Sequence, residues 1–326
     1  MLSYQEIINK IDQLEEANIL VSALELRIFS ILDKRWMSVS AISRVAMTQL
    51  DGMKMLLNAL SAMGVLKKRD DKYKNTQITY KYFCESSPSF KKGTVMLKLE
   101  NRDEYNQLTK VIRNGRDINS FEGDDDPEFR HLFTYAMHER SELYSDEVAK
   151  IITKNPVGNL IDLGCGSGTY SISILKRDKK AKATLMDRTE AIGVVHSIHK
   201  ENSVYKRLKF ICGDLFHNEF GLDYNTVLLF NILHIYNLQE NKKLFQKIHK
   251  ALRKGGRFIL FDFFLKQNQI EPYDAALFAL TMLLFTKTGK SYTFREVQSL
   301  LKDTGFARFK KMDVGYGSSI IEAIKI

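Results

Sequence analysis

The chain has 326 residues, of which 44% are apolar and 27% charged, and its formal net charge is +10. This length and balance predict a globular protein with one large domain, or with a catalytic domain and a smaller one. The longest apolar stretch, residues 275–285, is too short to cross a bilayer, so we expect no membrane partner. Because the basic residues are spread thinly, without a block of like charges, we also expect no nucleic-acid partner.

The cysteines and the first residues bear on the cellular compartment. Cys84, Cys165 and Cys212 have no metal-like spacing, and the last two fall in strands, or in their turns, that we expect to be buried. Reduced structural thiols and no metal site are therefore predicted. The first sixteen residues are acidic and amphipathic and lack the apolar run of a signal peptide. We expect a cytoplasmic protein.

The N-terminal part of the chain has the pattern of a winged helix. Apolar residues at helical spacing and turn residues between them predict three helices and then a β-ribbon. The expected helices cover residues 5–33, start near 38 and cover 51–63, and the expected strands cover 65–68 and 73–78. Such a module either binds DNA through its third helix or mediates dimerisation. That helix offers Lys54 as its single basic residue, which favours dimerisation.

Between the winged helix and the C-terminal half, the sequence predicts polar helices over residues 80–120 and one long helix over 129–153. The acidic segment 122–127, Glu-Gly-Asp-Asp-Asp-Pro, is the clearest linker between them. We therefore place a domain boundary here. Residues 1–122 are predicted to form a winged-helix dimerisation domain with a helical connector, and residues 123–326 to form the second domain.

The second domain alternates between strand and helix patterns, which predicts an α/β fold with a mostly parallel sheet covered on both faces. The expected strands are 160–163, 183–186, 208–212, 226–231, 257–264, 307–314 and 319–324, and the expected helices are 169–176, 190–200, 239–252 and 294–304.

The segment LIDLGCGSGTY at 160–170 is the most informative motif of the chain. It reads as a buried strand that contains Asp162, then a turn with Gly164, Gly166 and Gly168, then a helix. Glycines let the backbone turn sharply and approach a ligand closely, where a Cβ would intervene. A strand, a glycine turn and a helix N-terminus together predict a nucleotide-binding site at the carboxyl edge of the sheet, with Asp162 and the three glycines among its cofactor-binding residues.

Acids at the ends of the next two strands narrow the choice of ligand. Asp187 stands where a carboxylate can accept hydrogen bonds from both ribose hydroxyls. Asp214 can accept a hydrogen bond from the adenine amino group, with Leu215 and Phe216 on the two sides of the ring. NAD-binding sites also have an acid at the position of Asp187. The G-x-G-x-G spacing of the glycine turn, however, suits a ligand without a phosphate. The motif predicts an adenosine-containing cofactor.

These segments, in this order, resemble the class I S-adenosylmethionine-dependent methyltransferases, and specifically the small-molecule O-methyltransferases with an N-terminal winged-helix dimerisation domain. The resemblance lies in ALELRIF (23–29), LSAMGVL (60–66), AMH (136–138), LIDLGCGSGTY (160–170), GDLF (213–216), NILHIYNLQEN (231–241), LRKGGRFILFDFFL (252–265) and FALTMLLFTKTGKSY (278–292). It implies a Rossmann-like domain with a mostly parallel seven-stranded sheet. It also implies S-adenosyl-L-methionine as cofactor, S-adenosyl-L-homocysteine as product, a homodimer formed through the N-terminal domain, and Asn231 among the cofactor-binding residues.

The resemblance also implies the catalytic residues. In the family a His after the fourth strand acts as general base toward the acceptor hydroxyl, which matches His234, and Asp262 on the fifth strand can orient it. The chain departs from the plant enzymes in having Phe230, Ile235 and Ser291 where they have Lys, Asp and commonly Glu. This pattern resembles a bacterial branch of the family. It leaves two mechanisms open: His234 acts as a general base, or the protein only holds the acceptor close to the methyl group, without a base.

The acceptor pocket is expected between the carboxyl edge of the sheet and the helices 129–153 and 275–285. Its candidate lining residues are Phe133, Met137, His138, Phe278, Met282 and Phe285. Their apolar character predicts a small aromatic or apolar acceptor. The predicted function is methyl transfer to its hydroxyl group. The alternatives are a C-, N- or S-methyltransferase, and a DNA-binding regulator that senses S-adenosylmethionine.

Overall fold

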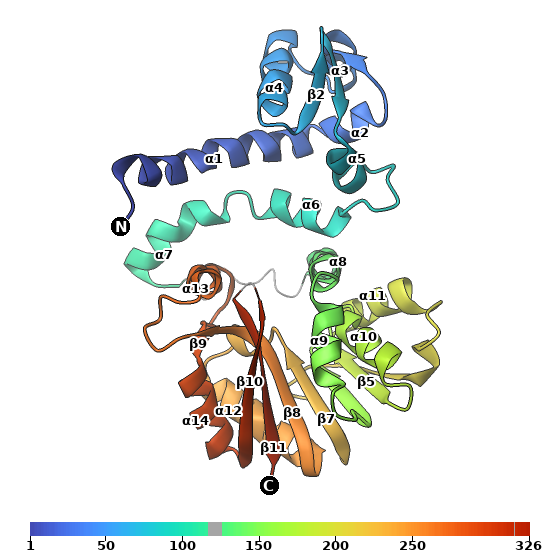
Figure 1. Cartoon of the computed structure of the whole chain (residues 1–326), viewed down its shortest axis with the longest axis vertical. Coiled ribbons are helices and arrows are strands. Elements are labelled where there is room, and N and C mark those ends of the chain that lie inside the picture. The colour runs from blue at the N-terminus through green and yellow to red at the C-terminus, as the bar shows by residue number, and fades with distance from the viewer. Residues whose placement is uncertain (117–125, 316) are drawn as a thin grey trace. The chain divides into compact units, whose positions relative to one another are not determined.

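The computed structural model describes residues 1–116, 126–315 and 317–326 (Figure 1). Two compact units make up the chain, Met1–Asp103 and Glu104–Ile326. Most of the predicted linker 122–127 lies outside the described residues.

The first unit has the helix and strand order predicted for a winged helix. Its helices are α1 (Tyr4–Glu25), α2 (Ile28–Leu32), α3 (Val39–Val45), α4 (Leu50–Ala62), α5 (Gln77–Phe83) and α6 (Lys92–Glu100), and its antiparallel sheet has the order β1 (Met37–Ser38), β3 (Lys72–Asn75), β2 (Leu66–Arg69). The helix predicted over 5–33 is divided at Arg27, whose φ is +54°. The second ribbon strand was predicted to reach residue 78 but ends at Asn75, because Thr76 caps α5 through the amide of Thr79.

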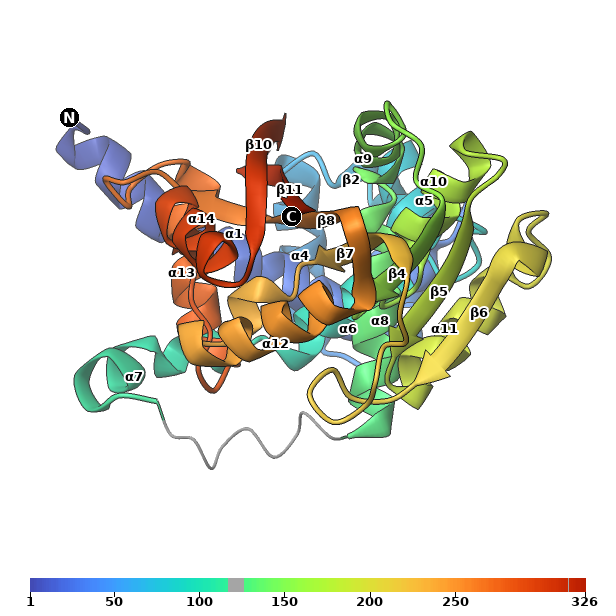
Figure 2. The ribbon, with the colours of Figure 1, turned by 90° about the horizontal axis from the view of Figure 1, so that it is seen from below.

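The second unit contains one large sheet whose strands follow the order β10, β11, β8, β7, β4, β5, β6 (Figure 2). Their bounds are β4 (Asn159–Leu163), β5 (Lys182–Asp187), β6 (Leu208–Cys212), β7 (Tyr224–Phe230), β8 (Leu252–Leu265), β10 (Phe306–Gly315) and β11 (Ser318–Lys325), and the short β9 (Tyr292–Thr293) also pairs with β8. All neighbours are parallel except at β11, which is antiparallel to β8 and β10. The chain leaves β4 toward β5 and later returns to β7 on its other side, so a ligand-binding switch point lies between β4 and β7.

The strands of this sheet send alternate side chains to two buried layers. Leu160 packs with α9 (Ser145–Ile152), α10 (Thr169–Arg177) and α11 (Thr189–His199), whereas Ile161 and Leu163 pack with α12 (Leu238–Ala251) and α14 (Phe294–Asp303). Figures 1 and 2 show these two sets of helices on opposite faces. The predicted α/β architecture and its mostly parallel sheet are confirmed.

The prediction of one long helix over 129–153 is wrong. The structure has two helices there, α8 (Pro127–Ser141) and α9, with a break between them. Asp126 caps α8 and Pro127 occupies its first turn. At the break, Leu143 and Tyr144 donate to carbonyls three residues earlier, which closes the helix with a tight turn. Among the described residues, the remaining α-helices of this unit are α7 (Leu108–Asn114) and α13 (Tyr273–Phe285).

Two further expectations can be compared with the structure. Cys84 and Cys165 are buried, but Cys212 is exposed because it ends β6, an edge strand of the sheet. In the part of the chain that the structure describes, no helix is long and apolar enough to cross a membrane.

Candidate active site

The glycine turn, residues 164–168, connects β4 to α10. Gly164, Gly166 and Gly168 have φ values of +69°, +53° and +70°, in the left-handed region that favours glycine. A Cβ added at Gly164 would overlap the side chain of Ile232, and one at Gly168 would lie 3.0 Å from Leu185. A Cβ added at Gly166 would have no heavy atom within 4 Å. A side chain at either outer glycine would therefore need a neighbouring side chain to shift, in addition to the strain of its positive φ, whereas the middle glycine borders open space that a ligand can enter.

The carboxylate of Asp187 holds the glycine turn at the end of β5. Its Oδ2 accepts a hydrogen bond of 2.7 Å from the amide of Gly166, and its Oδ1 accepts one of 2.7 Å from the amide of Arg188. Burial raises the pKa of Asp187, although both amides act in the opposite direction. The carboxylate therefore joins the glycine turn to the residue that precedes α11, and its predicted role in binding the ribose stays a prediction.

Asp162 lies beneath the same turn. Its side chain is almost fully buried and accepts a 2.6 Å hydrogen bond from the hydroxyl of Ser171 in α10. Burial, with a smaller contribution from the charge of Asp187, raises the pKa of Asp162 to about 7. The observed contact ties β4 to α10, so the structure places Asp162 as a support of the turn.

The loop after β6 carries the residues predicted to hold adenine. Asp214 Oδ1 accepts from the amides of Phe216 (2.8 Å) and His217 (3.1 Å), and Oδ2 is 3.1 Å from Nη2 of Arg188. Burial tends to raise the pKa of Asp214, but these amides and the guanidinium hold it below its ordinary value. Leu215 is buried, and the ring of Phe216 meets Tyr236 edge to face at 4.9 Å.

Lys247 on α12 fixes this loop, and the sequence analysis missed it. Its Nζ donates to the carbonyls of Leu215 (2.8 Å), Phe216 (3.0 Å) and Asn218 (2.8 Å), and it lies 4.6 Å from the ring centroid of Phe220. Burial lowers the pKa of Lys247. The sequence does show that Lys247 lies next to the apolar face of the helix. That position alone does not identify the loop whose carbonyls the lysine contacts.

His234 lies in the turn that follows β7, next to the cofactor side of the sheet edge. The chain leaves β7 through Asn231, whose φ is +56° and whose amide donates to the carbonyl of Phe261. His234 Nδ1 is 2.7 Å from Oδ1 of Asp262, and both side chains are buried. Since a carboxylate only accepts, Nδ1 is the donor and Nε2 is left as the basic atom. In the described part of the chain, no other hydrogen bond engages Nε2.

A loop comprising residues 286–291 packs on the backbone of the His234 turn. A Cβ at Gly289 would overlap the carbonyl oxygen of His234, so the two backbones are in direct contact. Arg116 donates to the carbonyls of Lys287 (3.1 Å) and Gly289 (2.5 Å) and holds the loop from outside. Ser291, where the plant enzymes commonly have Glu, donates to the carbonyl of Ala275 instead. Asp262 is thus the carboxylate paired with His234 among the described residues.

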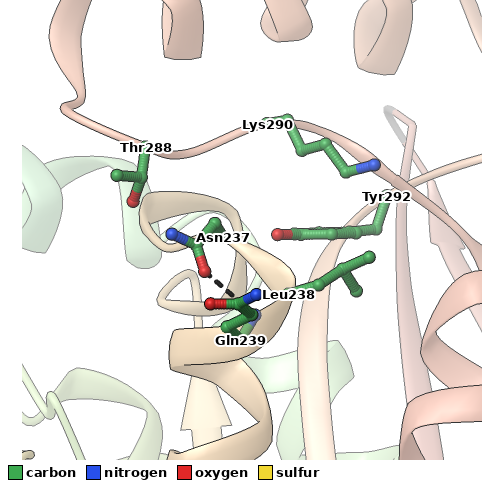
Figure 3. Close-up of a pocket in the computed structure, with 6 residues that line it drawn as sticks. All are labelled: Asn237, Leu238, Gln239, Thr288, Lys290 and Tyr292. Atoms are coloured by element: carbon green, nitrogen blue, oxygen red, sulfur yellow. Dashed lines mark hydrogen bonds between the residues drawn. The ribbon is translucent and has the colours of Figure 1, made fainter.

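A surface cavity of about 460 Å³ opens between this loop and the start of α12 (Figure 3). It is lined by Asn237, Leu238, Gln239, Thr288, Lys290 and Tyr292. Asn237 caps α12, and Lys290 forms an ion pair with Glu296. None of the predicted site residues lines this cavity, so it is distinct from the glycine turn and from His234.

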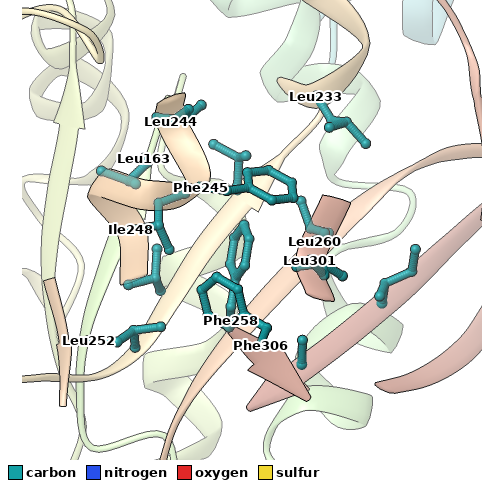
Figure 4. Close-up of a cluster of buried hydrophobic side chains, with 14 of the residues drawn as sticks. Leu163, Leu233, Leu244, Phe245, Ile248, Leu252, Phe258, Leu260, Leu301 and Phe306 are labelled. Atoms are coloured by element: carbon teal, nitrogen blue, oxygen red, sulfur yellow. The ribbon is translucent and has the colours of Figure 1, made fainter. Parts of the chain in front are cut away.

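Buried packing fixes the His234 turn from the other side. Leu233, the residue before it, is almost inaccessible and belongs to the hydrophobic cluster of α12, α14 and β8 (Figure 4). The cluster includes Phe245 and Phe258, whose rings meet edge to face at 4.9 Å. The proposed base therefore projects from a rigid support.

Helix α13 contributes aromatic and apolar side chains near His234. The ring of Phe278 meets the imidazole edge to face at 4.8 Å and packs on Phe263 at 4.5 Å. Met282 is buried, and Phe285 contacts Tyr105 at 6.2 Å. Of the three residues predicted from this helix, the structure brings Phe278 into contact with His234.

The residues predicted from α8 lie in different surroundings. Phe133 is 42% exposed and stacks on Phe129, while Met137 is half-buried. His138 Nδ1 is 2.7 Å from the hydroxyl of Thr169, the first residue of α10. This histidine thus contacts the helix that follows the glycine turn, and its predicted acceptor-binding role stays a prediction.

We expect alanine at Gly164 and at Gly166 to have different consequences. Gly164→Ala should lower the free energy of unfolding by about 3 kcal/mol, because strain and overlap with Ile232 add. Gly166→Ala should cost about 1 kcal/mol through its positive φ, yet weaken S-adenosylmethionine binding at least about tenfold by filling open space. Urea unfolding and isothermal titration measure the two effects. Wild-type affinity in Gly166→Ala would contradict this placement of the ligand.

Lys247→Met should weaken S-adenosylmethionine binding by about tenfold, because three carbonyls of the adenine loop lose their shared donor. The exposed Lys242 on the same helix provides the matched control, so Lys242→Met should leave the affinity unchanged. Lys247→Arg should restore part of the loss. Equal affinities for both methionine variants, measured by titration calorimetry, would show that Lys247 does not position the loop.

Comparison with known proteins agrees with this geometry. The model of the O-methyltransferase domain matches residues 100–307, and that of the O-methyltransferase dimerisation domain matches residues 11–83. The chain is 26% identical over 261 residues to 3-hydroxy-5-methyl-1-naphthoate 3-O-methyltransferase of Streptomyces sahachiroi, covering 77% of this chain and 74% of that protein. It is 25% identical to acetylserotonin O-methyltransferase of Gallus gallus, covering 94% and 92% of the two chains.

Solved structures share the fold along the whole chain. A putative O-methyltransferase from Nostoc punctiforme PCC 73102 is 25% identical, with a TM-score of 0.84 and 100% of both chains covered. Human N-acetylserotonin methyltransferase in complex with SAM is 20% identical, with a TM-score of 0.85, covering 99% of this chain and 97% of that one. Because the family model spans more than half of the chain, this protein belongs to the O-methyltransferase family, and its cofactor is S-adenosylmethionine.

Proposed function

We propose that the enzyme methylates a hydroxyl group of a small aromatic acceptor, with His234 as general base. The observation that carries the proposal is the buried pair in which Asp262 holds Nδ1 of His234 at 2.7 Å. Relatives support an aromatic acceptor, since two of them are named as methyltransferases of a hydroxynaphthoate and of acetylserotonin.

The cofactor-binding residues that we propose surround the open face of the glycine turn. Asp187 would bind the ribose and Asp214 the adenine amino group, with Leu215 and Phe216 against the ring. Gly166 would let the cofactor approach the backbone, with Asn231 at the neighbouring strand end. S-adenosylmethionine, when bound, supplies a methyl group on a sulfonium, whose sulfur keeps the electron pair of the broken bond and leaves as S-adenosylhomocysteine.

The protein's own chemical contribution is to move one proton. The acceptor hydroxyl would donate its proton to Nε2 of His234 as its oxygen forms the new bond to carbon. The imidazolium that results is stabilised by the adjacent carboxylate of Asp262, which also fixes the tautomer. General base catalysis of this kind contributes about 10²- to 10⁴-fold in rate.

The assembly and the compartment are also proposals. The match of residues 11–83 to a dimerisation domain supports a homodimer formed through the N-terminal region. We retain the division into a dimerisation domain, residues 1–122, and a methyltransferase domain, residues 123–326, and a cytoplasmic location without a nucleic-acid partner.

His234→Gln should lower kcat by about 10²- to 10⁴-fold while changing the Kd for S-adenosylmethionine less than about twofold, because only the proton acceptor is removed. Asp262→Asn should also lower kcat, since the amide reverses the tautomer preference. His131→Gln, an exposed histidine of α8, is the matched control. Transfer of labelled methyl groups to a panel of naphthols and hydroxynaphthoates measures the rates, with mass spectrometry to locate the methyl group.

The same set of test acceptors distinguishes base catalysis by His234 from methyl transfer by proximity alone. A phenol that is already ionised at the assay pH needs no base, so its methylation should fall much less in His234→Gln than that of a neutral phenol. An equal and small effect on both classes would argue for proximity alone.

A further inference from the structure

Arg140, near the C-terminal end of α8, carries a charge that the proposed function does not use. Its side chain is exposed, and in the part of the chain that the structure describes it pairs with no carboxylate. Its guanidinium carbon lies over the ring of Phe263, 5.5 Å from the centroid. A cation–π contact of this kind fixes the position of the guanidinium while leaving its hydrogen-bond donors available.

A continuous row of aromatic rings connects Arg140 to the proposed base. Phe263 packs on Phe278 at 4.5 Å with an angle of 32° between the rings, and Phe278 meets the imidazole of His234 at 4.8 Å. Phe263 follows Asp262 directly in β8. Two consecutive residues of one strand therefore contact the proposed base and the cation. Phe263 is buried, whereas Phe278 is half-buried, so the accessible part of the row is at Phe278.

The polar groups around Arg140 place it at the carboxyl edge of the sheet. The hydroxyl of Tyr170 interacts with the side chains of Ser141 and Asn231 and lies within electrostatic range of Arg140. Burial raises the pKa of Tyr170 to about 12, so this hydroxyl is neutral at physiological pH and supplies no negative charge to the guanidinium. Tyr170 therefore does not neutralise Arg140, and among the described residues no ion pair occupies its guanidinium.

We propose that the acceptor is an aromatic hydroxy acid whose carboxylate binds Arg140, whose ring lies against Phe278, and whose hydroxyl meets His234. This inference rests on the proposed function and adds the substrate class to it. A carboxylate fits because the planar guanidinium presents paired donors that match its two oxygens. The anchor at one end and the base at the other would select which hydroxyl of a ring system is methylated.

The test compares pairs of acceptors that differ only in the carboxylate, namely hydroxynaphthoates and the corresponding naphthols. Wild-type enzyme should prefer the acids. Arg140→Gln should lower kcat/KM for the acids by about 10- to 100-fold and for the naphthols by less than about twofold, because the lost contact is a charge-assisted hydrogen bond. Arg140→Lys should recover only part of the loss, since a lysine cannot form the bidentate pair.

Two controls separate this inference from the proposed function. Lys150→Gln removes an exposed charge from α9 and should leave both acceptor classes unaffected, and all variants should bind S-adenosylmethionine as the wild type does. If Arg140→Gln lowers kcat/KM equally for acids and naphthols, or if the wild type prefers the naphthols, the carboxylate anchor is wrong while O-methylation stands. If the wild type binds S-adenosylmethionine but methylates neither class, the proposed aromatic acceptor fails as well.

Discussion

The hydrogen bond from the amide of Gly166 to the carboxylate of Asp187 joins the ends of two parallel strands, and the cofactor side of the site depends on it. A turn with three left-handed residues has few ways to satisfy its amides, and a carboxylate at the next strand end provides one. Arg188 extends the connection from Asp187 to Asp214 and so to the adenine loop. Lys247 closes the series by holding the carbonyls of that loop. Each group that is proposed to touch the cofactor is thus held by another group of the protein.

The acceptor side is organised around β8 rather than around the glycine turn. Asp262 holds Nδ1 of His234, and the next residue along the strand, Phe263, packs on Phe278 and lies under the guanidinium of Arg140. Because β8 lies within the sheet between β7 and β11, its end cannot shift without disturbing its neighbours. Rigid placement of the proposed base matters, since misplacement of reacting groups by an ångström costs large factors in rate.

The sequence was sufficient for the features that depend on short-range pattern. The glycine turn and the acid at position 187 follow from a strand, a turn and a helix that are adjacent in the chain. Contacts over long sequence separations were not predictable in this way: Lys247 reaches a loop about thirty residues earlier, and Arg140 meets β8 more than a hundred residues later. The break between α8 and α9 was missed because apolar spacing continues through it, while three-residue hydrogen bonds end the first helix.

The contact between Gly289 and the carbonyl of His234 has a mechanical consequence. No side chain separates the two backbones, so displacement of the loop at 286–291 is transmitted directly to the imidazole. The loop begins where α13 ends, and the hydroxyl of Thr286 donates to the carbonyl of Met282 in that helix. The end of α13, the helix that carries Phe278 in contact with His234, is thereby coupled to the turn that holds the proposed base. If His234 is the base, as proposed, an acceptor too bulky to fit beside α13 would displace the same histidine that it needs, which makes shape a condition for reactivity as well as for binding.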